Sequence, residues 1–316
     1  MDTYLGIDTS CYTTSLCLVD GDYSIAADER IILTVPEGGR GLSQSNMVYQ
    51  HSRNLPVLFE RAAEVLKDRS VRAIAVTDQP RRRDDSYMPA FLAGLGYARA
   101  LSAVLGVPLY RLSHQENHLL AVLRSKGRVD RAPFYGIHLS GGTTELVRAE
   151  ADDKGLDITR LGGTSDISAG QFIDRMGVAM NLPFPAGVHV DKLAQKFSGS
   201  LKGAPVFFKD GEVSFSGPES QGQRFLKDGE TDLPRLCRWT LATVWRGLLH
   251  LLDYAAADGM THLVAAGGVM SNSYLRRELK EYCRKGHITL DLAEDGFSAD
   301  NASGAAFWAA LQEGKK

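Results

Sequence analysis

The sequence has little cysteine, no excess charge of one sign and no long hydrophobic run, and each shortage excludes a class of protein. Four cysteines in 316 residues, none in a C-x-x-C pair, are too few for a disulfide framework, so we expect a cytoplasmic location. Lys and Arg number 36 against 38 Asp and Glu, so any nucleic-acid contact must come from a local patch or a partner. No apolar run approaches the roughly 18 residues of a membrane span, and no basic leader precedes MDTYLGID. We therefore expect no membrane segment and no signal peptide.

Length and composition indicate a globular enzyme of about two domains. The chain is 44% hydrophobic and 23% charged, and its 316 residues exceed the size at which a single core usually stops growing. Strand and helix patterns alternate over the first 112 residues, as in an α/β fold whose sheet starts with an antiparallel meander. We predict strands at Tyr4–Asp8, Leu16–Asp20, Ile25–Thr34, Val71–Thr77 and Leu109–Leu112, and helices at about 47–67 and 87–105.

An internal repeat is the most informative feature of the chain. Residues 4–16 align without gaps over residues 134–146, with identities at Gly6/Gly136, Ile7/Ile137, Ser10/Ser140, Thr13/Thr143, Thr14/Thr144 and Leu16/Leu146. Generic turn chemistry shared by two hairpins is the alternative explanation. We interpret the repeat as a duplicated α/β domain, each half opening with a hairpin whose turn faces a cleft between the domains. The predicted first domain is 1–112 with about 295–316, and the second is 113–294.

The rest of the second half continues the α/β pattern. We predict helices at 168–181, about 236–258 and 300–313, further helices from Asp191 and Ser271, and strands at His262–Ala266 and Ile288–Leu292. Residues 199–235 are expected to be rich in loops, with short strands in PVFF and EVSFS. The last helix is expected to return to the first domain.

Two glycine-containing turns are candidates for phosphate binding. The run Ser140–Thr144 (SGGTT) offers backbone N–H and hydroxyl donors, and its adjacent glycines let the backbone approach an anion closely. The strand His262–Ala266 leads through Gly267 and Gly268 into a helix, an arrangement common in nucleotide sites. Both patterns also occur as plain turns, so a purely structural role stays open for each.

The stretch HQENH predicts two histidines on one face of a helix. His114 and His118 are spaced i, i+4 and can therefore share one metal ion. A zinc metalloprotease would need Glu directly after the first histidine, where this chain has Gln115, and Glu116 projects to another side of the helix. Asp300 is the best distant candidate for a third ligand. The alternative is a pair of solvated or core histidines.

Two other charged features are weaker signals. Asp8 ends the first strand, where a carboxylate could hold a metal or position water, and it is our candidate catalytic residue. The run Arg81–Asp85 (RRRDD) is a poor nucleic-acid patch because its aspartates cancel most of its field. A solvated or self-paired loop is the expected structure there.

In their order and spacing these motifs resemble the universal tRNA threonylcarbamoyl-adenosine transferase family, formerly called glycoproteases, of the actin/sugar-kinase/Hsp70 superfamily. The resemblance covers about residues 4–310. It is carried by GIDTSC, residues 38–51 ending in His51, HQENH, LSGGTTEL, GGTSDISAGQFIDRMGVAMNLPFPAGVHVDKLA, FSG at 215–217, GGVMSNSYLR and SADNAS.

The resemblance implies a fold, an activity and a site. The fold would be two duplicated actin-like (ASKHA, RNase H-like) α/β domains with mixed sheets flanked by helices. The activity would be metal-dependent transfer of threonylcarbamoyl from threonylcarbamoyl-AMP to N6 of adenosine 37 of tRNA. One iron or zinc ion would bind to His114, His118 and Asp300. The acyl-adenylate, with its adenine nucleotide, would bind to Leu139, Ser140, Gly141, Gly142, Thr143, Asp174, Gly187, Asp191, Gly267, Gly268 and Asn272. A smaller paralogous partner protein, or a second copy, would contact the helices of the first domain.

Departures from the family pattern keep two alternatives open. Tyr12 stands where an acidic residue usually follows T-S-C, and residues 79–90 replace a glycine-rich loop. Thr143 replaces a histidine, Ile167 replaces an acid, and Pro218-Glu219-Ser220 replaces L-K-T. These changes suit a divergent bacterial paralogue that binds ATP or an acyl- or carbamoyl-adenylate and modifies another acceptor. A non-catalytic nucleotide-binding partner protein is the other alternative.

Overall fold

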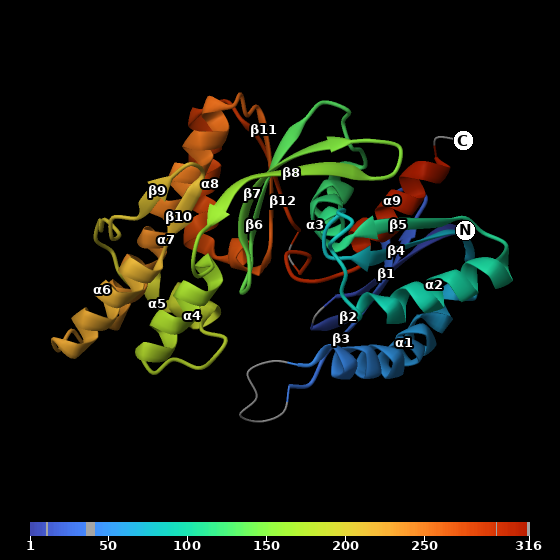
Figure 1. Ribbon diagram of the computed structural model, residues 1–316, viewed down its shortest axis with the longest axis horizontal. Coiled ribbons are helices and arrows are strands. Elements are labelled where there is room, and N and C mark those ends of the chain that lie inside the picture. The colour runs from blue at the N-terminus through green and yellow to red at the C-terminus, as the bar shows by residue number, and fades with distance from the viewer. Residues whose placement is uncertain (11, 36–41, 295, 315–316) are drawn as a thin grey trace. The chain divides into compact units, whose positions relative to one another are not determined.

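The computed structural model describes residues 1–10, 12–35, 42–294 and 296–314, and its contacts divide the chain into two compact units (Figure 1). Unit 1 comprises Met1–Ala132, Glu150–Ile158 and Asp300–Lys316, and unit 2 comprises Pro133–Ala149 and Thr159–Ala299. In the described part of the chain no helix has both the length and the apolar character needed to cross a membrane.

Unit 1 is built on a five-stranded mixed sheet. Its elements are β1 (Asp2–Thr9), β2 (Thr13–Asp20), β3 (Ile25–Ile32), α1 (Gln44–Leu66), β4 (Ser70–Gln79), α2 (Phe91–Leu105), β5 (Leu109–Ser113), α3 (His114–Leu123), a 3-10 turn η1 (Arg124–Lys126) and α9 (Ser303–Glu313). The strand order is β3-β2-β1-β4-β5. The predicted meander is confirmed, since β1, β2 and β3 pair antiparallel, and β4 and β5 extend the sheet in parallel.

Successive side chains of the first strands point to opposite faces of this sheet, and both faces are buried. Leu5 and Ile7 pack with residues of α1 and α2, and Cys17 and Val19 pack with Ala306 of α9 from the opposite face. The chain end therefore covers β1, as expected for a last helix that returns to the first domain.

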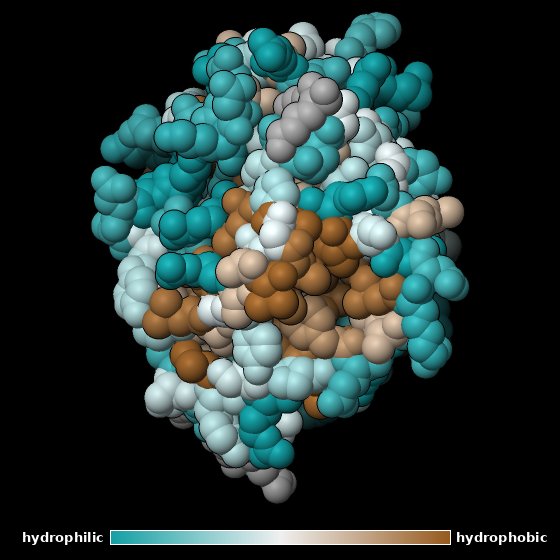
Figure 2. Space-filling model, turned by 90° about the vertical axis from the view of Figure 1, so that its right-hand side faces the viewer, coloured by the Kyte–Doolittle hydropathy of each residue, from teal (hydrophilic) through white to brown (hydrophobic). Residues whose placement is uncertain are grey.

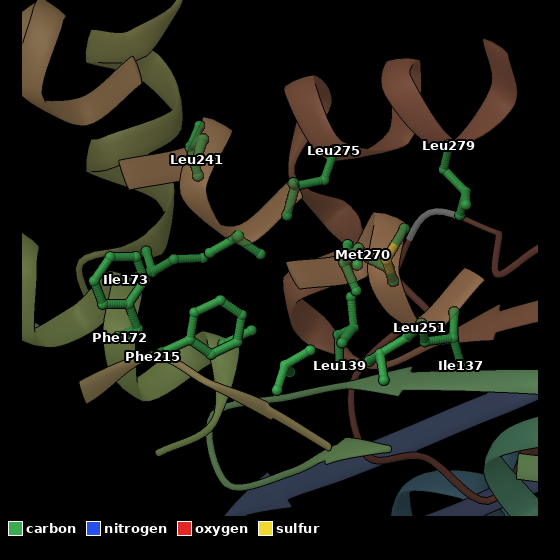
Figure 3. Packing of buried hydrophobic residues seen from close by; sticks show 14 of the residues in the cluster. Ile137, Leu139, Phe172, Ile173, Phe215, Leu241, Leu251, Met270, Leu275 and Leu279 are labelled. Atoms are coloured by element: carbon green, nitrogen blue, oxygen red, sulfur yellow. The ribbon is translucent and has the colours of Figure 1, made fainter. Parts of the chain in front are cut away.

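Unit 2 is built on a larger mixed sheet. Its elements are β6 (Phe134–Leu139), β7 (Thr144–Ala151), β8 (Leu156–Thr164), α4 (Ala169–Ala179), α5 (Gly187–Ala194), β9 (Phe207–Lys209), β10 (Glu212–Ser214), α6 (Ser216–Lys227), α7 (Leu233–Ala257), β11 (His262–Ala266), a 3-10 turn η2 (Gly268–Ser271), α8 (Ser273–Lys285) and β12 (Thr289–Leu292). The strand order is β12-β11-β6-β7-β8-β10-β9, and the tip of the β7–β8 hairpin is counted with unit 1. Ile137 and Leu139 of β6 lie in one buried cluster with residues of α4, α7 and α8 (Figure 3).

The internal repeat is a repeat of structure. Thr9 pairs with Thr14 at the end of the β1–β2 hairpin, and Leu139 pairs with Thr144 at the end of β6–β7, the same register 130 residues later. The order β3-β2-β1-β4-β5 matches the order β8-β7-β6-β11-β12, with parallel pairing from the first strand onward in both. The predicted duplicated α/β fold is confirmed.

Some elements differ from their prediction. Helix α6 forms inside residues 199–235, which we expected to be mostly loop, and α5 begins at Gly187 instead of Asp191. Helix α3 belongs to unit 1, whereas the predicted boundary at 112 assigned His114 and His118 to the second domain. The predicted domain limits and the cleft stay predictions. Cys17, Cys237 and Cys283 are buried free thiols, and Cys11 and the start of the 38–51 motif lie outside the described residues.

Candidate active site

Helix α3 brings together the two histidines of HQENH. Ser113 and Glu116 form a capping box that starts the helix directly after β5, so His114 occupies its first turn and His118 the next. Nε2 of His114 lies 2.9 Å from Nε2 of His118. Oδ1 of Asp300, from the segment before α9, lies 3.6 Å and 3.4 Å from these two nitrogens. The predicted ligand atoms of all three residues lie within 4.8 Å of one another, all in unit 1.

Asp8 orients this cluster from the end of β1. Its carboxylate is fully buried, and Oδ2 accepts a 2.6 Å hydrogen bond from Nδ1 of His114. The other oxygen accepts from the backbone N–H of Ser10 at 2.7 Å. A carboxylate on one ring nitrogen of a metal-binding histidine fixes the tautomer and directs the other nitrogen toward the metal. These contacts suit a positioning role for Asp8, and its predicted catalytic role stays a prediction.

Asn117 is a site residue that our sequence analysis did not identify. Its Nδ2 donates to Oδ2 of Asp8 at 3.0 Å and to the carbonyl of Asn301 at 2.6 Å, and its Oδ1 accepts from the N–H of Ala305. One fully buried amide thus links β1, α3 and the segment that carries Asp300. The sequence did contain a signal for this residue, because Asn117 is polar and lies one turn after His114 on the same face of the helix.

The charges of the cluster are strongly coupled. Burial disfavours the charged imidazolium of His114, but the carboxylates of Asp8 and Asp300 together raise the pKa of His114 well above its ordinary value. Burial likewise disfavours the carboxylate of Asp300, but the two imidazoles hold the pKa of Asp300 well below its ordinary value. An acid between two imidazoles and a buried carboxylate behind one of them make a donor set suited to a divalent cation.

In unit 2 the predicted phosphate loop is a tight turn. The Ser140 hydroxyl accepts from the N–H groups of Gly142 at 3.3 Å and Thr143 at 3.0 Å, so the loop satisfies part of its own donor set. The N-cap of α4, Ser168, donates to the carbonyl of Gly141 at 2.9 Å. Gly141 and Gly142 are exposed, and added Cβ atoms would meet open space. The loop is accessible and is hydrogen-bonded to the N-cap of α4.

The glycine turn after β11 packs directly on this loop. Gly267 has a left-handed φ of +96°, and an added Cβ would lie 2.2 Å from the carbonyl oxygen of Leu139, so the turn requires glycine. Gly268 is exposed and begins η2, and the Asn272 side chain then caps α8 through the N–H of Leu275. The structure therefore brings Leu139–Thr143 and Gly267–Gly268 together.

The other predicted substrate residues lie on α4 and α5, with Asp174 within α4 and Gly187 and Asp191 on α5. Asp174 accepts a hydrogen bond of 2.7 Å from the N–H of Ala186, the residue that precedes Gly187 and the start of α5. Asp191 accepts from the N–H and the hydroxyl of Ser273 at 3.0 Å and 2.8 Å, which joins α5 to the start of α8. These carboxylates have structural partners in the chain itself.

Asp166 is a second residue that our sequence analysis did not identify. Its carboxylate accepts five hydrogen bonds, from backbone and hydroxyl donors of Ile167, Ser214, Phe215 and Ser216. Burial would raise the pKa of Asp166, but these bonds lower it below its ordinary value. The carboxylate thereby fixes the FSG motif, at the start of α6, to the end of β8. Its position inside the family-like segment that begins GGTSD at residue 162 was the available signal in the sequence.

The elements that depart from the family pattern are also ordered. Tyr12 is 41% exposed at the β1–β2 turn, where His51 holds the neighbouring carbonyl of Ser10 through Nε2 at 2.7 Å. In the run Arg81–Asp85, Arg83 pairs with Asp85, as expected, but Arg82 pairs with Asp152 at 2.7 Å. Glu116 is buried, and its carboxylate accepts hydrogen bonds from the N–H groups of Ser113 and Leu156.

Comparisons with known proteins agree with this geometry. Residues 38–307 match the profile of the family described as tRNA N6-adenosine threonylcarbamoyltransferase. The enzymes of that name from Bdellovibrio bacteriovorus and Neorickettsia sennetsu are 30% and 29% identical to the chain, over 99% and 98% of its length and 93% and 92% of theirs. Among solved structures, the activator of 2-hydroxyisocaproyl-CoA dehydratase from Clostridium difficile with bound ADPNP is 14% identical, with a TM-score of 0.56 over 99% of this chain and 96% of that one. The last likeness concerns the fold, an actin-like pair of α/β domains.

Proposed function

Because the chain belongs to the tRNA N6-adenosine threonylcarbamoyltransferase family, we propose that it transfers a threonylcarbamoyl group from threonylcarbamoyl-AMP to N6 of adenosine 37 of tRNA. In that reaction the adenosine amine forms a bond to the carbamoyl carbon, and the bond from that carbon to the phosphate oxygen of AMP breaks. The amine loses a proton and AMP leaves. We place the reaction in the cytoplasm.

The convergence of His114, His118 and Asp300 is the observation that carries this proposal. These residues would hold one divalent metal ion, iron or zinc. When bound, such an ion supplies Lewis-acid polarisation of a carbonyl or stabilises a leaving phosphate. Asp8 would keep His114 in the tautomer whose Nε2 is the ligand atom. Asn117 would fix the position of Asp8 relative to the segment that carries Asp300.

The loops of unit 2 would bind the adenylate. The exposed glycines Gly141, Gly142 and Gly268 would let the backbone approach a phosphate. Asp174 of α4, Gly187 and Asp191 of α5, and Asn272 at the start of α8 would contact the nucleotide. An ADPNP-bound protein among the solved structures of this fold supports an adenine nucleotide as the ligand.

A protein partner would cover helix α2. Three of its large apolar side chains, Leu92, Val104 and Leu105, are 50%, 84% and 50% exposed, and Arg99 is its one charged residue. Brown side chains gather on the side of the molecule where α2 lies (Figure 2). An apolar helix at a surface marks an interface. We propose that a smaller paralogous protein or a second copy binds there.

A second candidate is transfer to an acceptor other than tRNA by a divergent paralogue. The observation that favours it is the exposed Tyr12 and the Arg82–Asp152 pair, where the family pattern has an acid and a glycine-rich loop. A nucleotide-binding partner protein without activity is less consistent with the oriented His114, His118 and Asp300.

The test is a transfer assay with metal-loaded protein, freshly made threonylcarbamoyl-AMP, unmodified ANN-decoding tRNA and the partner protein. Nucleosides are analysed by mass spectrometry. We expect threonylcarbamoyladenosine from the wild type and a loss of at least about 100-fold in His114→Ala, since a ligand is removed.

The control is Glu64→Gln, an exposed carboxylate on α1 that pairs only locally with Lys67. It should leave the product yield unchanged. A wild type that binds metal and adenylate but yields no product with any tRNA would refute the proposal and favour another acceptor.

A further inference from the structure

Helix α8 has one buried and one strongly basic side. Leu275, Leu279 and Cys283 recur every fourth residue and are buried, and Leu275 and Leu279 belong to the core of unit 2 (Figure 3). Arg277, Lys280 and Arg284 are exposed on the rest of the helix. The apolar side fixes α8, so the basic side is held in a defined position.

The basic side of α8 borders a shallow hollow of about 510 Å³. The hollow is lined by Ser273, Arg276, Arg277, Lys280, Glu281 and Arg284. We call the four cationic residues of this lining the α8 basic surface. A concave site with four cations and one carboxylate favours an extended anion.

Ion pairs within the helix compensate only part of this charge. Helix α8 carries five Lys and Arg residues and two glutamates. Glu281 pairs with Arg284 at 2.8 Å and with Lys285 at 3.3 Å, which lowers the pKa of Glu281 to about 2. Glu278 pairs with Arg277 at 2.7 Å. Because the whole chain has a net charge of −2, the positive charge here is a local feature.

The α8 basic surface begins next to the proposed adenylate site. Ser273, which lines the hollow, is held by Asp191 and directly follows Asn272. Both neighbours are proposed substrate residues. The guanidinium groups of Arg238 and Arg277 lie 4.3 Å and 5.1 Å from the ring centroid of Tyr274, and Arg238 extends the positive surface onto α7.

We propose that the α8 basic surface binds the phosphodiester backbone of the tRNA acceptor. The inference rests on the proposed function, which supplies a polyanion as substrate, and it adds the place where that polyanion binds. Phosphate contacts by Lys and Arg position a nucleic acid without reading its sequence. The α8 basic surface would thus orient any acceptor tRNA relative to the adenylate.

The test compares full-length wild type with the triple variant Arg277→Gln, Lys280→Gln, Arg284→Gln. Affinity for unmodified tRNA is measured by fluorescence anisotropy at several KCl concentrations. We expect affinity to fall on the order of tenfold or more, and the slope of log K against log salt to flatten by about 2 to 3, roughly one for each lost phosphate contact. Binding of threonylcarbamoyl-AMP should not change.

Two further variants separate binding from damage to the fold. Lys202→Gln, Lys209→Gln, Lys227→Gln removes the same charge from exposed sites elsewhere on unit 2 and should leave the salt slope unchanged. Glu281→Gln removes a competing carboxylate and should tighten tRNA binding by about two- to fivefold, the range that corresponds to one exposed ion pair. Loss of structure would not produce tighter binding.

The outcomes for the inference and for the proposed function differ. If wild type modifies tRNA and the triple variant keeps its affinity and salt slope, the inference is wrong and the function stands. If tRNA binding depends on the α8 basic surface but no product forms, the inference stands and the function fails. A wild type without measurable tRNA binding overturns both.

Discussion

At the scale of single residues, the contact of Asp8 with His114 gives a prediction about the proposed metal site. We predict that Asp8→Asn lowers affinity for a divalent metal by about 10- to 100-fold, because the amide no longer fixes the ring and basicity of His114. A chelator-competition titration measures the change. Asp20→Asn, which breaks a carboxylate–Arg69 pair in the same unit, should leave metal affinity unchanged. Equal affinities for wild type and Asp8→Asn would contradict the positioning role.

His51 gives a pH dependence that can be assigned to one group. Burial lowers the pKa of His51, although its hydrogen bond to the Ser10 carbonyl and the charge of Asp8 oppose the shift. Nδ1 of His51 lies 2.9 Å from the hydroxyl of Thr14. Because that hydroxyl accepts a hydrogen bond from Asn54, its own proton is free to point at Nδ1, as a neutral ring requires. A lowered histidine pKa gives stability that is present above the unfolded value near 6.5 and lost as pH falls below it.

We therefore predict that wild type loses more stability than His51→Gln as pH falls from about 7 toward 5. The free energy of unfolding from urea titrations at several pH values measures this. Because the other histidines are present in both proteins, the difference isolates His51. Identical pH profiles would show that His51 is not held neutral in the folded state.

The sequence identified the proposed ligands but not what holds them. His114 and His118 follow from helix spacing, and Asp300 follows from the order of motifs. The role of Asn117 depends on three elements meeting at one amide, and no local pattern encodes that meeting. The same holds for Asp166, four of whose five hydrogen bonds come from residues about 50 positions away.

At the scale of elements, α3 carries His114 and His118 and packs against α9, which follows Asp300. An added Cβ at Gly304 would lie 2.0 Å from the backbone oxygen of Asn117, so α9 can approach α3 only with glycine there. We predict that Gly304→Ala lowers stability by about 1–3 kcal/mol through overpacking and also weakens metal binding, because Asp300 precedes α9. Thermal unfolding and metal titration measure the two effects.

The control for this prediction is Gly96→Ala in helix α2, where an added Cβ meets open space. It should leave metal affinity unchanged and stabilise the helix by about 0.5–1 kcal/mol. If Gly304→Ala behaves like this control, close packing of α9 on α3 is not what positions Asp300.

Strongly patterned elements were predictable, whereas weakly patterned ones were not. The hairpin repeat, the strands near it and α7 have clear apolar periodicity and formed as expected. Helix α6 has the sequence SGPESQGQRFLK, which is mostly polar with two glycines and a proline, so its pattern resembles a loop. It forms because Asp166 anchors its first turn and Pro218 and Gly222 are buried.

At the scale of the whole molecule, the repeat predicted two α/β domains of one kind, but the predicted boundary at 112 separates α3 from unit 1, to which its contacts assign it. That assignment depends on tertiary contacts, since α3 packs against α9 from the far end of the chain. The net charge of −2 also conceals the basic side of α8, because opposite charges elsewhere balance it. Whole-chain averages therefore missed the features that we propose as interaction surfaces.

The apolar side of α2 yields a prediction for the assembly. Exposed Leu92 and Val104 would be removed from water in a complex, and each buried aliphatic side chain stabilises by roughly 1.5–3 kcal/mol. We predict that wild type associates with the smaller partner or with itself, and that Leu92→Glu, Val104→Glu weakens this by about 100-fold or more, since two charges would enter an apolar interface. Sedimentation equilibrium with and without the partner measures it. Val178→Glu, a 51% exposed valine on α4 of unit 2, is the control that should associate normally. A wild type that stays monomeric at every concentration, alone and with the partner, would mean that α2 is not an interface.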